Sequence, residues 1–566
     1  MRLHVKIVKF ENTGADTFIT NNVNIMKKIL FLAAAALLAA VSCGSPKGGE
    51  AEDGQKLFIG DDIAVAQTQY GKVRGYILND IYQFKGIPYG APTGGKNRFM
   101  PPQKPEPWDG IRNAYNYGQS APQVVGYDRS PESPGFLTDA WNYDTFGEDC
   151  LRLNVWTPKL DAGKRPVIVW LHGGGFSSGN AIEQDGYGGE NLARYGDIVF
   201  VSVNHRLNSF GYSDFASVGG EKYLHSGNVG MLDIVAALQW IHDNITNFGG
   251  DPGNVTVIGQ SGGGSKVSMI AAMPAAKGLV HKGVALSGNS ISGADKASAE
   301  KLGEYILKEA GLKPAQIDKL QEMPWEEYYA LANRASRRMA AETGMSAGFR
   351  PVSDGIDLPL NFFDPNDPNV PDIPMLYCTV FQESNPNRTD ASLEDITLDG
   401  VVEQLKSRYG DNTRQIVEAY AKTFPDCRPI EIWALLTGVR SNVVRAANTK
   451  LQQKSPVYMA WFGWQPPLFD GRMRAFHCLD ICFWLHTTDA MITHTGGGAR
   501  PRALSDKMSD ALLAFMRTGD PNCKSLPAWP KYTAETGEVM VLNDVCEVQN
   551  DPDRECRTLL EQLTAR

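Results

Sequence analysis

Short, almost continuous apolar runs that alternate with helical periodicity are the feature that most limits what this chain can fold into. Residues 166–171 and 198–203 have the composition of strands that are buried on both faces of a sheet. Over residues 230–248, apolar side chains recur at three- and four-residue steps, which predicts an amphipathic helix. Another apolar strand follows at 255–258, and residues 264–273 begin like a helix. This alternation predicts an α/β fold with a central, mostly parallel sheet flanked by helices.

The length and charge of the chain limit its organisation and its partners. It has 566 residues, of which 42% are hydrophobic and 21% charged, as in an ordered globular protein. We interpret residues 62–566 as one α/β domain with large insertions, in which 296–345 and 396–450 form a lid or side layer. The formal net charge of −9, without a cluster of Lys and Arg, argues against nucleic acid as a partner.

The N-terminal segment predicts export and anchoring. Lys27 and Lys28 form a short basic start, and the apolar run 29–41 is too short to span a bilayer but suits a signal peptide. The sequence Ala-Val-Ser-Cys-Gly at 40–44 resembles the cleavage box of a bacterial lipoprotein. The resemblance implies that cleavage removes 26–42 and that Cys43 carries a lipid. We therefore expect a lipoprotein of the bacterial cell envelope that faces the periplasm or the exterior. The alternative is an ordinary signal peptide and a secreted soluble protein.

The flanking segments have simpler interpretations. Residues 1–25 lack the pattern of a signal peptide, a basic start followed by an apolar run, and we interpret them as an upstream start-site artefact or a leader. Residues 43–61 contain Gly, Ser and Glu and predict a tether.

The cysteines do not predict a metal site. Nine are present, and their spacing shows no paired C-x-x-C motifs with histidines, so neither zinc nor another cofactor is predicted. If Cys43 is lipidated, eight cysteines remain in an oxidising compartment, where disulfides can form. The first pair to test is Cys523 with Cys546 or Cys556, because these residues share one loop-rich C-terminal segment.

A candidate nucleophile lies between a predicted strand and a predicted helix. Gly259-Gln260-Ser261-Gly262-Gly263 follows the strand at 255–258 directly and precedes the helix. A sharp strand-to-helix turn strains its central residue and exposes it at the carboxyl end of the sheet, and glycines allow the backbones to approach. A bare G-x-S-x-G pattern is weak in a chain with 57 glycines, and a structural turn serine is the alternative. The strand-turn-helix context favours Ser261 as a nucleophile.

A second glycine-rich motif ends the strand at 166–171. In His172-Gly173-Gly174-Gly175-Phe176, three glycines leave backbone N–H groups unobstructed, which suits the stabilisation of a tetrahedral oxyanion. A phosphate-binding loop is disfavoured, because neither Lys-Ser nor Lys-Thr follows and no G-x-G-x-x-G spacing exists here. We predict an oxyanion hole formed by the N–H groups of Gly174, Gly175 and Gly262.

A serine nucleophile needs a base, and the base needs an acid that fixes its tautomer. With the chain order Ser, acid, His, the histidines that lie late enough are His477, His486 and His494. The residues alone leave the choice among these three open.

Several longer motifs resemble one family. The segment from Phe248-Gly249-Gly250-Asp251-Pro252 through Gly259-Gln260-Ser261-Gly262-Gly263 is similar to the active-serine signature of type-B carboxylesterases, the cholinesterase-like family of the α/β-hydrolase fold. The segment 148–156 resembles their second signature, and Phe84-Lys85-Gly86-Ile87-Pro88-Tyr89 also resembles a family segment. The resemblance extends from about residue 62 to 560.

The resemblance implies the two remaining catalytic residues. The strand at 372–379 is similar to the one that precedes the family's acid, and this assigns the acid to Glu383. Phe476-His477-Cys478 matches the family's histidine motif, which makes His477 the base. Asp354 is the competing carboxylate, and its Pro-Val-Ser-Asp-Gly context favours a turn former. Ser384 and Cys478 stand where the family usually has glycine, and Gln260 replaces the more usual Glu.

We therefore expect a carboxylic ester hydrolase that works through an acyl-enzyme on neutral short- to medium-chain esters. A serine peptidase or an acyltransferase would use the same triad and is the alternative. A non-catalytic adhesion module is a more remote one, because Ser261, Glu383 and His477 are all present.

Overall fold

The computed structural model describes residues 54–124, 145–345, 348–388 and 390–564. Residues from Leu57 onward form one compact unit. The predicted leader, signal peptide and lipid-bearing Cys43 lie outside the described residues, as does most of the predicted tether. Within the tether predicted over 43–61, Leu57–Phe58 form a strand that pairs antiparallel with Tyr76–Leu78. The folded unit therefore begins before residue 62.

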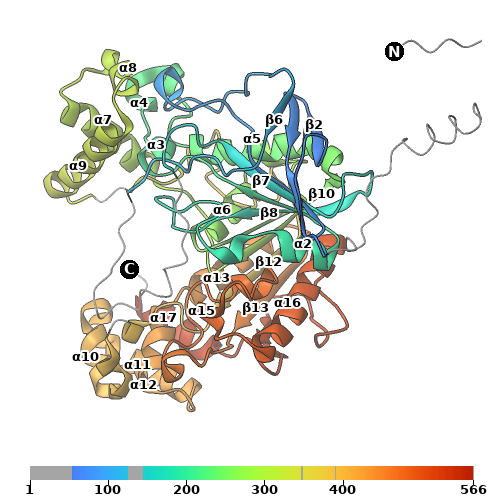
Figure 1. The fold of residues 1–566 in the computed structure, drawn as a ribbon. Coiled ribbons are helices and arrows are strands. Elements are labelled where there is room, and N and C mark those ends of the chain that lie inside the picture. The colour runs from blue at the N-terminus through green and yellow to red at the C-terminus, as the bar shows by residue number, and fades with distance from the viewer. Residues whose placement is uncertain (1–53, 125–144, 346–347, 389, 565–566) are drawn as a thin grey trace, which may run out of the picture. The chain divides into compact units, whose positions relative to one another are not determined.

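The centre of the molecule is a sheet of 12 strands in the order β1-β4-β5-β7-β9-β8-β10-β11-β12-β13-β14-β15 (Figure 1). Its strands are β1 (Leu57–Phe58), β4 (Tyr76–Leu78), β5 (Ile81–Pro88), β7 (Arg152–Thr157), β8 (Arg165–Leu171), β9 (Val199–Val203), β10 (Gly250–Gln260), β11 (Lys282–Leu286), β12 (Met375–Val380), β13 (Val457–Phe462), β14 (Glu538–Leu542) and β15 (Glu547–Asn550). All pairings from β9 to β14 are parallel. The fold class predicted from the sequence is confirmed.

A small second sheet lies beside the large one. It has the order β2-β3-β6, with β2 at Val65–Thr68, β3 at Gly71–Arg74 and β6 at Ile111–Asn113.

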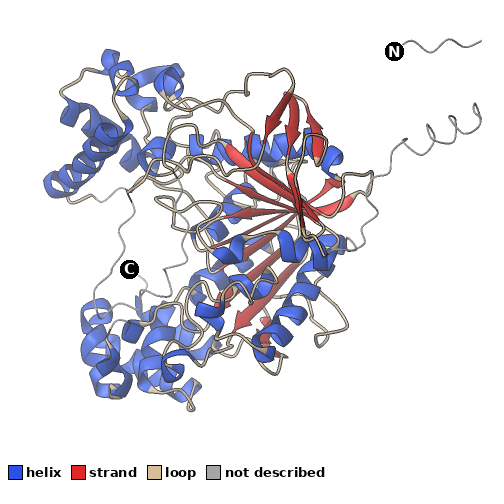
Figure 2. Ribbon diagram, viewed as in Figure 1, coloured by secondary structure: helices blue, strands red, loops and turns tan. Residues whose placement is uncertain are grey.

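Helices cover both faces of the large sheet (Figure 2). The main helices are α2 (Glu190–Gly196), α5 (Val229–Asn244), α6 (Gly262–Ile270), α7 (Lys296–Ala310), α9 (Trp325–Thr343), α10 (Leu398–Tyr409), α11 (Thr413–Thr423), α12 (Pro429–Thr437), α13 (Arg440–Lys450), α14 (Ile481–Trp484), α16 (Ala499–Thr518) and α17 (Arg554–Thr564). Helices α5, α6 and α13 contact one face of the sheet, and α2 and α16 contact the other.

Successive residues of each central strand enter two different cores. In β8, Val167 and Val169 belong to the core beneath α5 and α6, while Ile168 and Trp170 belong to the core beneath α16. All four side chains are buried. Burial on both faces explains why the strand sequences are continuously apolar and do not alternate between apolar and polar residues. It also fixes the register, because a slip by one residue would exchange the two cores.

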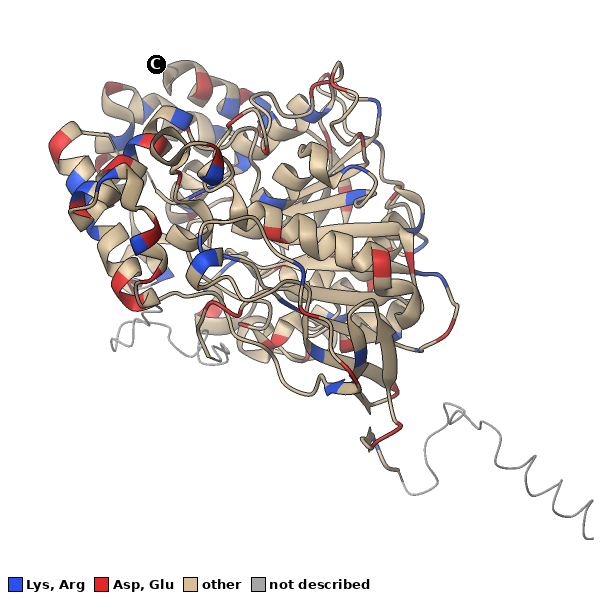
Figure 3. Ribbon diagram, turned by 90° about the horizontal axis from the view of Figure 1, so that it is seen from above, with Lys and Arg blue, Asp and Glu red and all other residues tan. Residues whose placement is uncertain are grey.

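The regions predicted as a lid or side layer are helical. Residues 296–343 contain α7 and α9, and residues 398–450 contain α10 to α13. Lys, Arg, Asp and Glu are interspersed along the helices and loops of the molecule (Figure 3). Among the described helices, none combines the length and the apolar character needed to cross a bilayer. Since β8, β10 and β12 run parallel, their carboxyl ends meet at one edge of the sheet, where the candidate site lies.

Candidate active site

Ser261 occupies the sharp turn predicted for it. Strand β10 ends at Gln260, α6 begins at Gly262, and Ser261 between them has φ 57° and ψ −120°. Few non-glycine residues adopt this conformation, and it marks a strained position that its surroundings must hold in place. The backbone N–H of Ser261 donates to the carbonyl of Leu286, at the end of β11, over 2.8 Å. The strain and its fixation are the features expected of a serine that is lifted above the sheet edge.

The glycines of the turn are required by close packing. A Cβ on Gly259 would lie 2.6 Å from the carbonyl oxygen of Leu171, and one on Gly263 would overlap the same oxygen. Helix α6 therefore starts in direct backbone contact with the end of β8. This contact places the nucleophile beside the glycine-rich loop that follows β8.

The hydrogen bonds of this loop determine where its N–H groups point. The His172 ring, through Nδ1, donates to the Gly173 carbonyl over 3.0 Å. The Gly174 carbonyl accepts from the N–H groups of Ser177 and Ser178. In a trans peptide unit the N–H points in the opposite direction to the C=O. The Gly174 N–H therefore points away from the Gly173 carbonyl, and the Gly175 N–H points away from the Gly174 carbonyl. Positive φ angles of 76° and 63° at these two residues produce this turn of the chain.

Gly262 completes the candidate oxyanion hole. A Cβ on it would overlap the backbone of Gly175, so the two main chains are in contact. Within the described residues, the N–H groups of Gly174, Gly175 and Gly262 donate no hydrogen bond. Three unpaired donors next to the nucleophile can stabilise an oxyanion, and this geometry supports the predicted hole.

Glu383 and His477 are paired as the family resemblance implied. Oxygen Oε2 of Glu383 lies 2.5 Å from Nδ1 of His477, and its Oε1 accepts from the N–H of Val380 over 3.0 Å. The glutamate side chain is buried, whereas the histidine side chain is 34% exposed. A carboxylate on Nδ1 holds the ring with Nε2 available as the base.

Two loops distant in sequence are joined to make this pair. Gln382 donates its N–H to the Ala475 carbonyl over 3.1 Å, and its side-chain Oε1 accepts from the N–H of Ala475 over 3.1 Å. Gln382 also forms a parallel bridge with Phe476. The residues that follow, Glu383 and His477, are thereby placed side by side although they are 94 positions apart.

The environment of His477 raises its basicity. Burial lowers the pKa of His477, but the neighbouring Cys478 and the hydrogen-bonded Glu383 carboxylate raise it. The resulting pKa of His477 lies well above the usual value. Behind the pair lies Asp480, which is fully buried. Burial, with the Glu383 charge in addition, raises the pKa of Asp480 to about 7.

The contact between nucleophile and base is not closed in this structure. Among the described residues, the Ser261 hydroxyl forms no hydrogen bond, and the side-chain Nε2 of Gln260 lies 3.3 Å from His477 Nε2. Gln260 in turn accepts from the Cys478 thiol over 3.2 Å. Catalytic hydrogen bonds are often long before substrate binds. Gln260 and Cys478, two departures from the family pattern, thus contact one another beside the base.

The competing residues have other partners. His486 stacks on Tyr195, and His494 packs against Phe476 with its Nδ1 3.1 Å from the Thr493 hydroxyl. Asp354 accepts three backbone N–H groups through Oδ1 and Asn228 through Oδ2. Asp354 is therefore the turn former that its sequence context favoured.

The cysteines are not paired in this structure. The eight described ones, Cys150 to Cys556, are all free thiols, so no bond joins Cys523 to Cys546 or Cys556. Cys478, at φ 78°, occupies a left-handed conformation that suits the glycine usual in the family.

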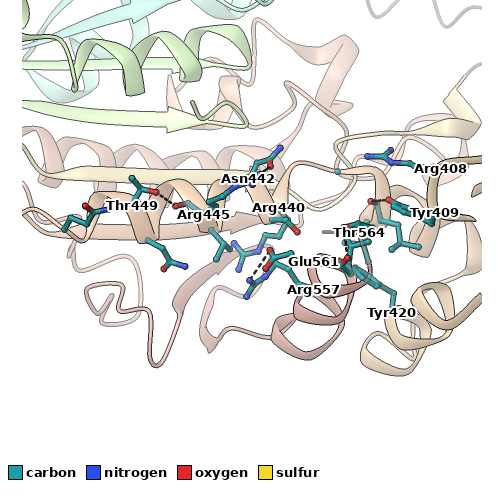
Figure 4. Close-up of a pocket in the computed structure, with 18 residues that line it drawn as sticks. Arg408, Tyr409, Tyr420, Arg440, Asn442, Arg445, Thr449, Arg557, Glu561 and Thr564 are labelled. Atoms are coloured by element: carbon teal, nitrogen blue, oxygen red, sulfur yellow. Dashed lines mark hydrogen bonds and ion pairs between the residues drawn. The ribbon is translucent and has the colours of Figure 1, made fainter. Parts of the chain in front are cut away.

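A cavity of about 870 Å³ lies between α12, α13 and α17 (Figure 4). Arg408, Arg440, Arg445 and Arg557 line it, and none of its lining residues belongs to the triad or the oxyanion glycines. A Cβ added to Gly438, which also lines it, would lie 3.7 Å from the Cβ of Glu383. The cavity is thus separate from the candidate catalytic residues.

Sequence reasoning missed two residues of the site. Asp480 follows the histidine by three positions, and Lys266 follows the serine by five. Both are ionisable side chains inside apolar segments. Ionisable residues are rarely buried, so their occurrence in such segments is the signal that could have identified them.

The chain is similar to known proteins along most of its length. The model of the carboxylesterase family matches residues 62–558. The chain is 32% identical to para-nitrobenzyl esterase of Bacillus subtilis (strain 168) over 516 residues, which cover 88% of this chain and 98% of that protein. It is 31% identical to phenmedipham hydrolase of Pseudarthrobacter oxydans, with 85% and 95% covered. The solved structure of a Clostridium hathewayi esterase that hydrolyses aliphatic aromatic polyesters superposes with a TM-score of 0.76 at 34% identity, with 90% and 100% covered.

Proposed function

The chain belongs to the carboxylesterase family and is a carboxylic ester hydrolase; from this premise we propose that Ser261, His477 and Glu383 are its catalytic triad. The observation that carries the proposal is the 2.5 Å contact between Glu383 and His477 at the sheet edge that also bears Ser261. The adjacent N–H groups of Gly174, Gly175 and Gly262 support it. These are the groups that an acyl transfer through serine needs.

In the acylation half of the reaction, His477 Nε2 takes the proton of the Ser261 hydroxyl. The Ser261 oxygen attacks the ester carbonyl carbon, and the carbonyl electron pair moves to the oxygen in the glycine-lined hole. Glu383 remains ionised and stabilises the imidazolium. When the tetrahedral intermediate collapses, the alcohol leaves with the proton from His477, and the acyl group remains on Ser261.

Deacylation repeats the sequence with water. His477 removes a proton from the water molecule, whose oxygen attacks the acyl carbonyl. The second tetrahedral intermediate collapses to the carboxylic acid, and His477 returns the proton to the Ser261 oxygen. Replacing Glu383 removes the charge that supports imidazolium in both halves, so both rates should fall together.

We infer neutral short- to medium-chain esters as substrates. The relatives are named for a para-nitrobenzyl ester, for phenmedipham and for aliphatic aromatic polyesters, which supports uncharged, partly apolar esters. The net charge of −9 does not favour choline esters, because net charge affects steering more than pocket chemistry.

A substrate panel tests this assignment. The panel contains aryl and alkyl esters of increasing acyl length, a choline ester and a peptide p-nitroanilide, each compared by kcat/KM. We expect neutral short- to medium-chain esters to be preferred. A preference for the choline ester would overturn the substrate class. Turnover of the anilide without the esters would support a peptidase, and acyl transfer to an added alcohol without hydrolysis would support an acyltransferase.

We further propose that the protein is a lipoprotein of the bacterial envelope, on the basis of the segment from Lys27 to Cys43. The basic start, the 13-residue apolar run at 29–41 and the cysteine at its end support this. Cells grown with a labelled fatty acid should incorporate the label into the wild-type protein and not into Cys43→Ser. An unlabelled wild-type protein with a different N-terminus would contradict the anchor and would leave the catalytic proposal untouched.

A further inference from the structure

A lysine is buried beneath the catalytic loops. Lys266, in the second turn of α6, has an exposed fraction of 0%. Its Nζ donates to the carbonyl oxygen of His172 over 2.9 Å and lies 5.8 Å from the centre of the Phe176 ring. Within the described part of the chain, Lys266 forms no direct ion pair with a carboxylate. A buried ammonium of this kind is unfavourable for folding, so its presence beside the site requires a reason.

The surroundings of the lysine are nearly uncharged. Burial lowers the pKa of Lys266 to about 7, and the Glu183 carboxylate opposes this shift. Burial first, and then the nearby lysine, hold the pKa of His172 and that of His205 well below the usual value. These two rings stack with centroids 5.1 Å apart. The neutral imidazole of His172 can therefore donate from Nδ1 to the Gly173 carbonyl, as its geometry indicates.

Three consecutive carbonyls of the oxyanion loop are each held by a donor. Lys266 holds that of His172, the His172 ring holds that of Gly173, and Ser177 and Ser178 hold that of Gly174. Each carbonyl fixes the opposite N–H of its peptide unit. The lysine is the first donor of the series, and it is the one that belongs to the helix that carries the nucleophile.

We propose that Lys266 is a positioning residue that ties the nucleophile helix to the oxyanion loop. Ser261 caps α6, Gly262 opens it and Lys266 lies one turn further on, so one rigid element holds the nucleophile, one oxyanion donor and the peptide unit 172–173 that directly precedes the other two donors. The start of the loop that carries the Gly174 and Gly175 N–H groups is thereby tied to the helix that carries the Gly262 N–H. The inference rests on the proposed triad and oxyanion hole. It predicts that Lys266 affects the transition state more than the bound substrate.

The test compares three variants. Lys266→Met retains the length of the side chain but removes its charge and its donors, and Lys266→Arg retains both. Lys450→Met is the matched control, because Lys450, the last residue of α13, is also 0% exposed but bonds to Asp372, which precedes β12, and to Gln453, which follows α13. For each variant, kcat and KM for a p-nitrophenyl ester, the melting temperature, and inhibition by a trifluoromethyl ketone and by a non-reactive amide analogue are measured.

For Lys266→Met we expect kcat to fall by about 10- to 100-fold with KM within about twofold, because oxyanion donors are displaced but not removed. Affinity for the trifluoromethyl ketone, which forms a tetrahedral adduct, should fall by a similar factor, while affinity for the amide analogue should persist. Lys266→Arg should recover most of kcat. Lys450→Met should lower the melting temperature with kcat unchanged.

A kcat for Lys266→Met within twofold of wild type, or an equal loss of affinity for both inhibitors, would overturn the inference. If that variant does not fold, a crystal structure of the wild type with the ketone bound tests the proposed role of Lys266 instead. We expect the Lys266 Nζ within hydrogen-bond distance of the His172 carbonyl, and a reversed 172–173 peptide unit would refute the proposal. An adduct on a residue other than Ser261 would instead contradict the proposed function.

Discussion

The two halves of the active site are built in different ways. The half that contains Ser261 and the oxyanion glycines is made of main chain, at the ends of two adjacent parallel strands, β8 and β10, where glycines allow backbone contact. The half that contains Glu383 and His477 is made of side chains on two loops that Gln382 joins to Ala475. The first half is rigid because an added Cβ would overlap backbone atoms at Gly174, Gly259, Gly262 and Gly263. The second depends on a few polar contacts and on the protonation of one imidazole.

This difference determines how each half should respond to substitution. A change in the main-chain half alters geometry, so it should affect stability and the transition state together. A change in the side-chain half alters charge, so it should move the pH dependence of the reaction. The predictions that follow separate these two responses.

The largest effect is expected at the point where the two halves meet. Ser261→Ala removes the nucleophile. Because alanine is smaller than serine, the substitution adds no bulk to the strained turn, and the fold should be retained. We expect kcat to fall by roughly 10⁴- to 10⁶-fold, with the residual rate due to the oxyanion hole. Steady-state kinetics and circular dichroism check this. Near-normal esterase activity in a folded Ser261→Ala protein would remove the basis of the mechanism.

The side-chain half is tested by Glu383→Gln. The amide keeps a hydrogen-bonding group but loses the charge that supports imidazolium, so kcat should fall by roughly 10²- to 10⁴-fold. Because the carboxylate raises the pKa of His477, its loss should lower that pKa. The base must be neutral, so the acid limb of the kcat–pH profile should move to lower pH.

Asp354→Asn is the control for the acid. The Asp354 carboxylate accepts three backbone N–H groups and so stabilises a turn. The substitution should weaken these hydrogen bonds and lower the stability of the protein, but it should leave the pH profile in place. The opposite pattern, with Asp354→Asn damaging and Glu383→Gln silent, would show that the acid is misassigned.

The main-chain half is tested by Gly263→Ala. The added Cβ would overlap the Leu171 carbonyl oxygen, so α6 or the loop after β8 must move. We expect kcat to fall by about 10²-fold through the displaced donors, and stability to fall by about 2–3 kcal/mol from overpacking. The acid limb should not shift, since no charge has changed. Gly348→Ala, where the added Cβ meets open space, should change neither quantity.

The smallest effect is expected at Cys478. Cys478→Gly relieves a left-handed conformation at φ 78° and removes the thiol that donates to Gln260. These changes oppose one another, so stability should change by less than about 1 kcal/mol and kcat by less than about threefold. Thermal unfolding and kinetics measure both. A loss of kcat above tenfold would mean that the side-chain half includes the Cys478–Gln260 contact as a required part.

The same difference explains what the sequence could predict. The strands at 166–171, 198–203 and 255–258 and the turn at Ser261 are local patterns, because burial on both faces and close backbone contact each restrict composition over a few residues. The choice among His477, His486 and His494 was open on the residues alone. The pairing of Gln382 with Ala475 that selects His477 joins loops with no common local pattern, so only the family resemblance identified it. Lys266 stands out as an ionisable residue in an apolar segment, but its partner is a main-chain carbonyl, which no residue type in the sequence identifies.

Covalent labelling of Ser261 tests the central claim most directly. The protein is treated with a fluorophosphonate, which reacts with activated serines, and the labelled peptide is identified by mass spectrometry. We predict one adduct per chain, on the peptide that contains Ser261, no adduct in Ser261→Ala, and labelling slowed by about 10²-fold or more in Glu383→Gln, as the loss of activated nucleophile requires. An adduct on Ser265 or Cys478, or undiminished labelling of Ser261→Ala, would contradict the account.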